Sequence, residues 1–283
     1  MKASLIMRHN FYMAEAIKFT SVLCFGNLPA PIKLSIPVYT YFHNINLLTL
    51  TEAHGLKEKT LSWMKRQVFR HYKHNTDLWL VQTQNTAYEL IKHLKENKKR
   101  VKLLPFFELN DDLKNLKNKT HGNDYTYIAN YTGAKGHEEL LEAWRILHKR
   151  GIDRFLHLTV DKTNIAFCNM INQAQLEGVR IVNHGIIPFK EVIKIYLKSK
   201  AEVYPSHNES LGLGIIEAIS AGCDVICADL PYTHAICTPS VLFSPINAIS
   251  IANAIEKYER YNYEKSELLV VDKIDDLISL LKD

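Results

Sequence analysis

The chain has 283 residues, 47% of them hydrophobic, and can therefore bury a sizeable core as one or two domains. No stretch approaches the ~20 uninterrupted apolar residues that a membrane-spanning helix needs, and charged residues interrupt the apolar start of the chain. The five cysteines form no CxxC pair, which argues against disulfides and against a metal site. We therefore expect a cytoplasmic protein of a reducing compartment, with neither a signal peptide nor a membrane span.

Charge is unevenly distributed along the chain. Residues 1–120 contain 19 Lys/Arg and 9 Asp/Glu, whereas residues 121–283 contain 16 and 21. The basic first half is expected to meet an anionic partner.

Four β-rich runs and two helices are predicted in the first half. The runs are residues 20–27, 36–44, 77–83 and 100–106, and the helices are residues 57–75 and 86–99. The segment KASLIM near the start is interpreted as the remnant of a further strand. Residues 108–123 are polar and rich in Asn, which predicts a linker between domains 1–120 and 121–283.

The helix over residues 57–75 is predicted to be amphipathic and basic. Apolar residues recur in it at helical spacing, at Leu61, Met64, Val68 and Tyr72, with Trp63 nearby and basic residues around them at Lys57, Lys59, Lys65, Arg66, Arg70 and Lys73. One interpretation is ordinary packing against a sheet. The other is contact with an anionic membrane surface or a lipid-diphosphate acceptor. RNA would also suit the charge, but no aromatic-rich binding motif accompanies it, so a nucleic-acid partner is not expected.

From about residue 124 onward, short β-rich runs alternate with helical stretches. Strands are predicted at 125–131, 154–160, 178–185, 201–206, 223–230 and 241–245, with helices at 137–151, 189–200 and 213–222, before residue 177 and after residue 245. Strands that alternate with helices of this length form βαβ crossovers and a parallel sheet covered on both faces. Two Rossmann-like halves of this kind bind ligands at the carboxyl ends of their strands.

The stretch SHNESLGLGIIEAISAG, residues 206–222, follows a strand that Pro205 ends. Its apolar residues predict a helix that begins near Leu213 and ends at Gly222 in a left-handed cap. The loop before this helix therefore lies at the carboxyl end of a strand, where a ligand is expected.

Two glycines and two glutamates in this stretch suggest what that ligand is. Gly212 and Gly214 would let a diphosphate approach the free N–H groups of the helix start. Glu209 and Glu217 would then accept hydrogen bonds from hydroxyls on either side, which describes a nucleotide sugar. The plainer interpretation is that the glycines only permit close packing of the helix on the sheet and that Glu209 is solvated.

The run ESLGLGIIEA, residues 209–218, resembles the signature of the retaining glycosyltransferases of family 4, in which seven residues separate two glutamates. YIANYTGAKGHEELLEAW, residues 127–144, is similar to the first unit of that family's C-terminal domain, a strand followed by a Lys-Gly loop and a helix. The resemblance covers roughly residues 124–260. It implies the GT-B fold, an α/β protein of two Rossmann-like domains whose parallel sheets face a cleft, here with a shortened N-terminal domain.

The resemblance also assigns roles. Glu217 would bind the ribose of the donor, Glu209 the transferred sugar, and Lys135 would neutralise the diphosphate. The other donor-binding residues that it implies are Gly136, Ser206, Leu211, Gly212 and Leu213. Many members of the family have Gly-Arg before the Lys-Gly loop, where this chain has Ala129 and Asn130.

In the first half, His43 ends a strand at a place where the family often has a histidine near the transferred sugar. His43 and Glu209 are therefore the catalytic candidates. The other interpretation of His43 is an interior histidine that caps the following helix. Gln82 and Thr83 end the next strand and are expected to face the same cleft.

The resemblance, taken with these residues, implies a retaining hexosyltransferase that needs neither a metal nor a cofactor besides its nucleotide-sugar substrate. Its acceptor is expected to be a glycan or a lipid-linked molecule of bacterial surface polysaccharide synthesis, at the inner face of the plasma membrane. The alternatives are a nucleotide-sugar epimerase of the same fold and a catalytically silent subunit that pairs with a complete transferase as its protein partner.

Overall fold

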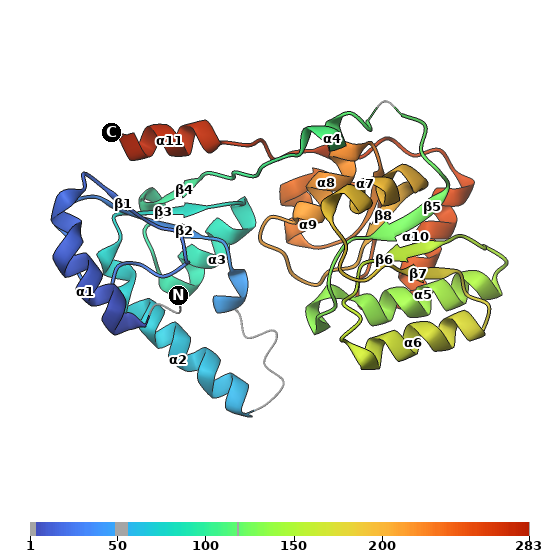
Figure 1. Cartoon of the computed structure of the whole chain (residues 1–283), viewed down its shortest axis with the longest axis horizontal. Coiled ribbons are helices and arrows are strands. Elements are labelled where there is room, and N and C mark those ends of the chain that lie inside the picture. Colours follow the sequence, from blue (N-terminus) through green and yellow to red (C-terminus); the bar gives the residue numbers. More distant parts are fainter. Residues whose placement is uncertain (1–3, 49–55, 118, 283) are drawn as a thin grey trace. The chain divides into compact units, whose positions relative to one another are not determined.

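The computed structural model describes residues 4–48, 56–117 and 119–282 (Figure 1). Its contacts divide the chain into two compact units. Unit 1 is Met1–Phe107 with Val271–Asp283, and unit 2 is Glu108–Val270. This division differs from the expected domains 1–120 and 121–283 at both boundaries, because residues 108–120 pack in unit 2 and the C-terminal residues pack in unit 1.

Unit 2 contains a parallel sheet with strand order β11-β9-β8-β5-β6-β7. Its strands are β5 (Asp124–Tyr127), β6 (Leu156–Leu158), β7 (Ile181–Asn183), β8 (Ser199–Tyr204), β9 (Asp224–Ala228) and β11 (Val241–Phe243). The chain builds the sheet outward from β5 in one direction and then from β8 in the other. Sheets of this topology bind ligands beyond the carboxyl ends of the strands where the order reverses, which here are β5 and β8.

Helices cover both faces of this sheet, which confirms the predicted strand and helix alternation. They are α4 (Asp111–Lys114), α5 (His137–Lys149), α6 (Ile165–Leu176), α7 (Phe189–Lys198), α8 (Leu213–Ala221), α9 (Pro231–Ile236) and α10 (Ala248–Arg260). Helix α5 packs against α6 and α10, whereas α7 packs against α8 (Figure 1). Amphipathic spacing explains the packing of α5, since Leu140, Trp144 and Leu147 are buried on one side.

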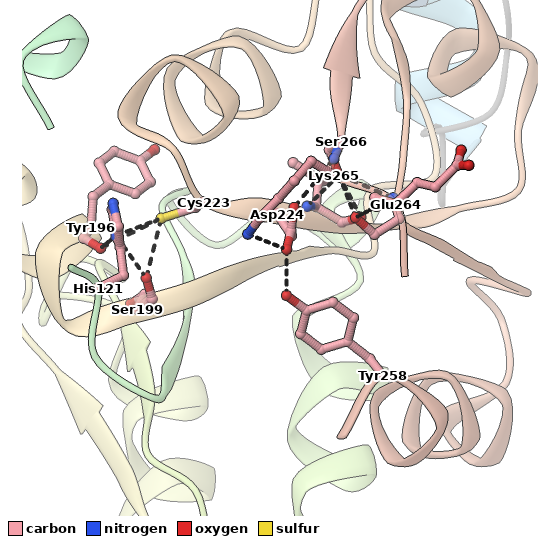
Figure 2. Close-up of polar contacts among 11 residues, drawn as sticks. His121, Tyr196, Ser199, Cys223, Asp224, Tyr258, Glu264, Lys265 and Ser266 are labelled. Atoms are coloured by element: carbon pink, nitrogen blue, oxygen red, sulfur yellow. Dashed lines mark hydrogen bonds and ion pairs between the residues drawn. The ribbon is translucent and has the colours of Figure 1, made fainter. Parts of the chain in front are cut away.

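A buried carboxylate fixes the amino end of strand β9. Asp224 Oδ2 accepts hydrogen bonds from the Tyr258 hydroxyl (2.6 Å) and the Lys265 ammonium (2.9 Å), and Oδ1 accepts one from the backbone N–H of Ser266 (3.2 Å; Figure 2). These bonds tie α10 and the segment before β12 (Glu267–Leu268) to the sheet. Strand β12 forms an antiparallel ladder with β10 (Cys237–Thr238).

Cys223 and His121, beside this carboxylate in Figure 2, resemble a nucleophile and its base but form a cap. The His121 Nδ1 is 2.9 Å from the Tyr196 carbonyl and 3.1 Å from that of Ser199, so it donates a proton and cannot accept one. The thiol of Cys223 points at the same two carbonyl oxygens, and burial raises its pKa. Both side chains therefore bind the C-terminal end of α7.

The described residues of the polar segment, 108–117 and 119–123, have more regular structure than the predicted linker. The segment includes α4, and Leu113 and Leu116 are buried. The main chain at Lys117 lies against Gly222, which ends α8 in the left-handed conformation that the sequence predicts. The segment thus belongs to the packing of unit 2.

Unit 1 contains a parallel sheet with strand order β1-β2-β3-β4 in the described residues. The strands are β1 (Val22–Cys24), β2 (Val38–Phe42), β3 (Leu78–Val81) and β4 (Val101–Leu103), and the longer helices are α1 (Leu5–Glu15), α2 (Leu56–Tyr72), α3 (Gln84–Leu94) and α11 (Ile274–Lys282). Among the described helices, none is both long enough and apolar enough to cross a bilayer.

Helix α2 packs on the sheet through Phe69, which contacts Phe42 and Trp79 in the core with ring centroids 5.4 and 5.3 Å apart. This supports the interpretation of a helix packed against a sheet. Met64, which the sequence assigns to the apolar face, is instead exposed together with Trp63. The side chains of Lys57, Lys59, Leu61 and Lys65 lie outside the described residues.

Both terminal helices differ from expectation. The predicted strand remnant KASLIM contributes to helix α1, whose first turn the Ser4 hydroxyl caps by accepting the Met7 N–H. Helix α11 is part of unit 1, because Leu277 packs against Tyr41, Leu80 and Leu104. The pattern of apolar residues along a helix does not indicate which sheet the helix packs against.

We expect Leu277→Ala to lower the free energy of unfolding by about 2–4 kcal/mol, because it leaves a cavity in the unit 1 core. Urea denaturation followed by tryptophan fluorescence measures this loss, since Trp79 lies in unit 1. Ile278→Ala is the matched control, because Ile278 is exposed on the same helix, and its cost should stay below about 1 kcal/mol. Equal costs for the two variants would show that α11 does not contribute to this core.

Candidate functional site

Two loops at the carboxyl ends of β5 and β8 carry the predicted donor-binding residues. The β5 loop is residues 128–136, and the β8 loop is residues 205–212. Because β5 and β8 are parallel neighbours, with Tyr125 opposite Ala201, both loops leave the same edge of the sheet. They lie at the reversal of strand order, the expected ligand position.

Hydrogen bonds hold these two loops together. The backbone N–H of His207 donates to the carbonyl oxygen of Ala134 at 2.8 Å, and the buried Ser206 hydroxyl lies 3.3 Å from the same oxygen. The Ser206 carbonyl accepts the Tyr232 hydroxyl of α9 at 2.6 Å. The predicted donor-binding Ser206 therefore bonds to the loops themselves and fixes their geometry.

Gly136 stands where the β5 loop passes close to Pro205 of the β8 loop. Its φ of +66° is a left-handed conformation that other residues adopt at a cost. A Cβ at this position would collide with the Pro205 carbonyl oxygen and lie 3.0 Å from the Pro205 Cβ. Contact between the loops thus accounts for the glycine of the Lys-Gly pair.

Lys135 and Glu209 are in direct contact. The Lys135 ammonium forms an ion pair with Glu209 Oε1, and the Tyr204 hydroxyl donates to the same oxygen at 3.0 Å. The two charged side chains are only 26% and 13% exposed, so their interaction is screened less than on the surface. The structure brings together the predicted diphosphate-binding cation and the predicted sugar-binding carboxylate from opposite loops.

Different features of the structure explain the two glycines at the start of α8. Gly212 is the N-cap with a φ of +62°, and as a glycine it has no side chain that could cap the helix. A Cβ on Gly214 would lie 2.9 Å from a ring carbon of Tyr204, so close packing on β8 explains this glycine. Gly212 therefore adds no side chain at the helix start, with Leu211 buried before it and Leu213 exposed after it.

Glu217 is half-buried one turn inside α8. Burial raises the pKa of its carboxyl, and the Tyr196 hydroxyl of α7 lowers it. A carboxylate that has lost part of its hydration is stabilised by further hydrogen-bond donors, and ribose hydroxyls are donors of this kind.

His43 lies at the end of β2 in unit 1, where Asn27 determines its protonation. Asn27 Oδ1 accepts the N–H groups of His43 (2.8 Å) and Asn44 (2.9 Å), so its amide nitrogen faces His43 Nε2 at 3.1 Å. An amide nitrogen only donates, which makes Nε2 the acceptor and leaves the ring proton on Nδ1. Burial lowers the pKa of His43, so the ring is neutral at neutral pH. Thr83, on the next strand end, accepts the Thr86 N–H and caps α3.

Asn130 stands where many family members have an arginine, and it has a structural role in the β5 loop. Its Oδ1 accepts the backbone N–H groups of Tyr131 (2.9 Å) and Asp161 (3.0 Å). His137, at the start of α5, lies 3.2 Å from the Ala129 carbonyl, and burial lowers its pKa to about 4. Neither side chain carries a positive charge, so Lys135 is the cation that the β5 loop contributes.

Three residues next to the motif are not predicted from the sequence. Tyr196, Glu202 and Tyr204 come from α7 and β8 and surround Glu209 and Glu217. Of these three, only Glu202 stands out in the sequence. It is a glutamate within the run AEVYPS, and it interrupts a strand that is otherwise apolar and covered on both faces.

We expect Gly136→Ala to destabilise the protein by at least ~3 kcal/mol, since a left-handed alanine costs ~1 kcal/mol and the collision with Pro205 adds to it. Gly151→Ala is the control, because Gly151 has a φ of +75° but nothing within reach of an added Cβ. Thermal unfolding of both variants measures the difference. A cost for Gly136→Ala no larger than for Gly151→Ala would mean that the loops separate freely.

Comparisons with known proteins agree with this architecture. A family model described as glycosyl transferases group 1 matches residues 108–269. The O-antigen chain mannosyltransferase RfbU of Salmonella typhimurium is 35% identical over 75 residues, which are 26% of this chain and 21% of that protein.

Solved structures share the fold at low identity. Sucrose-phosphate synthase from Thermosynechococcus elongatus gives a TM-score of 0.60 at 19% identity, over 80% of this chain and 59% of the other. The E. coli trehalose-6-phosphate structure with bound UDP-2-fluoro glucose gives 0.61 at 11% identity, over 91% and 64%. The chain thus spans less than two thirds of each of these relatives. The fold is the α/β GT-B fold, and because the family model covers more than half of its length, the chain belongs to the glycosyl transferases group 1 family.

Proposed function

We propose that this protein transfers a sugar from a nucleotide-diphosphate sugar to a glycan or a lipid-linked acceptor. The observation that carries this proposal is the contact between Lys135 and Glu209 at the reversal of strand order in unit 2. A cation and a hydroxyl-binding carboxylate in contact suit a ligand in which a diphosphate is joined to a sugar.

The proposed chemistry uses charge stabilisation of the leaving group. Lys135 and the free N–H groups at the start of α8 take up the negative charge that develops on the nucleoside diphosphate, so a metal is not required. Glu209 orients the sugar and Glu217 the ribose. Retention at the anomeric carbon follows from the resemblance to family 4, in which the departing phosphate assists the attack, and no side chain is assigned as a general base.

The acceptor is proposed to belong to bacterial surface polysaccharide synthesis. RfbU, the relative with 35% identity over 75 residues, is an O-antigen chain mannosyltransferase. A silent subunit or an epimerase would bind the same donor, so binding alone does not separate these activities from transfer. Release of nucleoside diphosphate by the purified chain, with and without a bacterial lipid-linked glycan fraction, separates them.

We expect Glu217→Ala to weaken the binding of UDP, GDP or ADP, whichever binds best, by roughly 10- to 100-fold. The reason is the loss of a charged acceptor for the ribose hydroxyls. Isothermal titration calorimetry measures the affinity, and Glu191→Ala, on the exposed side of α7, serves as the control. Unchanged affinity in Glu217→Ala would remove the ribose role, and no binding of any nucleotide by the wild-type protein would overturn the proposed function.

We propose further that unit 1 contacts the anionic inner surface of the plasma membrane. Residues 1–107 contain 16 Lys/Arg and 6 Asp/Glu. Helix α1 exposes an apolar side, where Ile6 and Met13 are 74% and 66% accessible, and Ile17, in the short 3-10 helix that follows α1, is 90% accessible. Trp63 of α2 is also exposed, beside the basic Arg66 and Arg70 of that helix. Apolar side chains and basic charge on one unit are typical of proteins that bind anionic lipid surfaces.

We expect the double variant Ile6→Glu, Met13→Glu to bind vesicles at least ~tenfold more weakly than the wild type. Each apolar side chain that enters the bilayer interface contributes about 1.5 kcal/mol or more to binding. Co-sedimentation with phosphatidylglycerol-containing vesicles measures it, and phosphatidylcholine vesicles report the charge dependence. Leu176→Glu, on the exposed side of α6 in unit 2, is the matched control. Equal binding by all three proteins would exclude α1 as the contact.

A further inference from the structure

Glu202 is a fully buried carboxyl directly beneath the predicted donor site. It lies on β8, and its exposed fraction is 0%. Oε1 accepts the backbone N–H of Ile128, the first residue of the β5 loop, at 3.0 Å. Oε2 is buried and has no hydrogen-bond partner among the described residues. A buried polar atom without a partner is costly, and such atoms often mark functional sites.

The first turn of α8 lies on this carboxyl. A Cβ on Gly214 would lie 3.5 Å from Glu202 Oε1 and 3.7 Å from Oε2. The carboxyl of Glu202 therefore lies against the first turn of α8, whose N–H groups are proposed to bind the diphosphate. The buried Tyr196 hydroxyl of α7 lies near both Glu202 and Glu217 and lowers the pKa of Glu217.

The surroundings of Glu202 favour its protonated form. Burial is the main cause that raises its pKa, and Glu217 and Glu209 raise it further, whereas the Ile128 N–H and Lys135 lower it, with the result at about 8. Titratable and charged groups interact with Glu202 from every element around it. They are Tyr127 on β5, Lys135 and Glu209 in the two loops, Tyr196 on α7, Tyr204 on β8, Glu217 on α8, Cys227 on β9 and Cys223 just before β9.

We propose that Glu202 is a positioning residue of the donor site, which as a neutral acid holds the β5 loop under the diphosphate without adding negative charge there. This inference rests on the proposed function. The neutral carboxyl keeps Ile128 in place and leaves Lys135 free to act on the diphosphate once Glu209 turns to the sugar. Ionised Glu202 adds a third carboxylate next to Lys135, so it competes with the diphosphate for the same cation.

The proposal predicts that nucleotide binding takes up a proton. A bound diphosphate disfavours the ionised form of Glu202, so at about pH 8 the protein binds a proton as it binds the nucleotide. Affinity should fall about five- to tenfold between about pH 7.5 and pH 9.5, a range in which the phosphates themselves, with a pKa of about 6, no longer titrate. The tyrosines and cysteines around Glu202 have raised pKa values and are present in every variant.

The test titrates UDP, GDP and ADP in turn into the wild-type protein, Glu202→Gln and Glu202→Leu, in two buffers of different ionisation enthalpy, which reports proton uptake. Glu202→Gln imitates the neutral acid, so we expect wild-type affinity at pH 7.5, less than a twofold change by pH 9.5 and no proton uptake. Glu202→Leu leaves the Ile128 N–H unpaired, so its affinity should be lower at every pH. Rescue by Gln but not by Leu, together with the loss of proton uptake, is the expected result.

A measurement without ligand separates this inference from the proposed function. Glu202 has a pKa of about 8 in the folded protein and its ordinary pKa, about 4.5, in the unfolded chain. Between these values the unfolded chain loses the proton while the folded protein keeps it, so a rising pH increasingly favours unfolding. The melting temperature of Glu202→Gln should therefore exceed that of the wild type by a margin that grows from pH 5 to pH 8 and then stays constant. If nucleotide binding by Glu202→Gln depended on pH and took up a proton as it does in the wild type, the Glu202 inference alone would be overturned. If the difference in melting temperature grew with pH but the wild type bound no nucleotide, the proposed function would be overturned, and the donor role of Glu202 with it.

Discussion

The pairing of β5 with β8 is the constraint on which the predicted donor site depends. These strands are neighbours because the chain completes one half of the unit 2 sheet before it starts the other. Their two loops must therefore leave the sheet side by side, so closely that Gly136 has no room for a side chain against Pro205. The Lys-Gly pair and the Glu-x7-Glu motif, far apart in the sequence, are thus two halves of one contact.

This contact concentrates acidic groups around one lysine. Glu209 takes the Lys135 ammonium as its partner, Glu217 is half-buried in α8, and Glu202 lies beneath both without exposure. Buried charges are tolerated where they are paired or where a proton neutralises them, and this cluster uses both means. The negative charge that such a site can accept from a ligand is therefore set as much by protonation as by the number of lysines.

The parts of the fold that the sequence predicts are those with local signals. The strand and helix alternation after residue 124 is confirmed because periods of two and 3.6 residues are visible in short windows, and Gly222 marks the end of α8. The short apolar run at the start has no such period, so α1 is mistaken for a strand. The packing of α11 on Tyr41 and Leu80 depends on residues distant in sequence, and no local pattern reports it. For the site, motif spacing indicates Lys135 and Glu209, but their contact needs the strand order, and the partners of Glu202 are visible only in three dimensions.

The discontinuity of unit 1 has a consequence for how the protein is made. Residues 108–270 are contiguous, so unit 2 can fold once Val270 has left the ribosome. The sheet of unit 1 is synthesised first, yet the residues that cover Tyr41, Leu80 and Leu104 emerge only after unit 2, a delay on the order of 10 s at ordinary rates of translation. During that time this apolar surface is without its native cover and open to chaperones or to other nascent chains. The domain made first is therefore the last to be completed, the reverse of the usual order in which domains fold during synthesis.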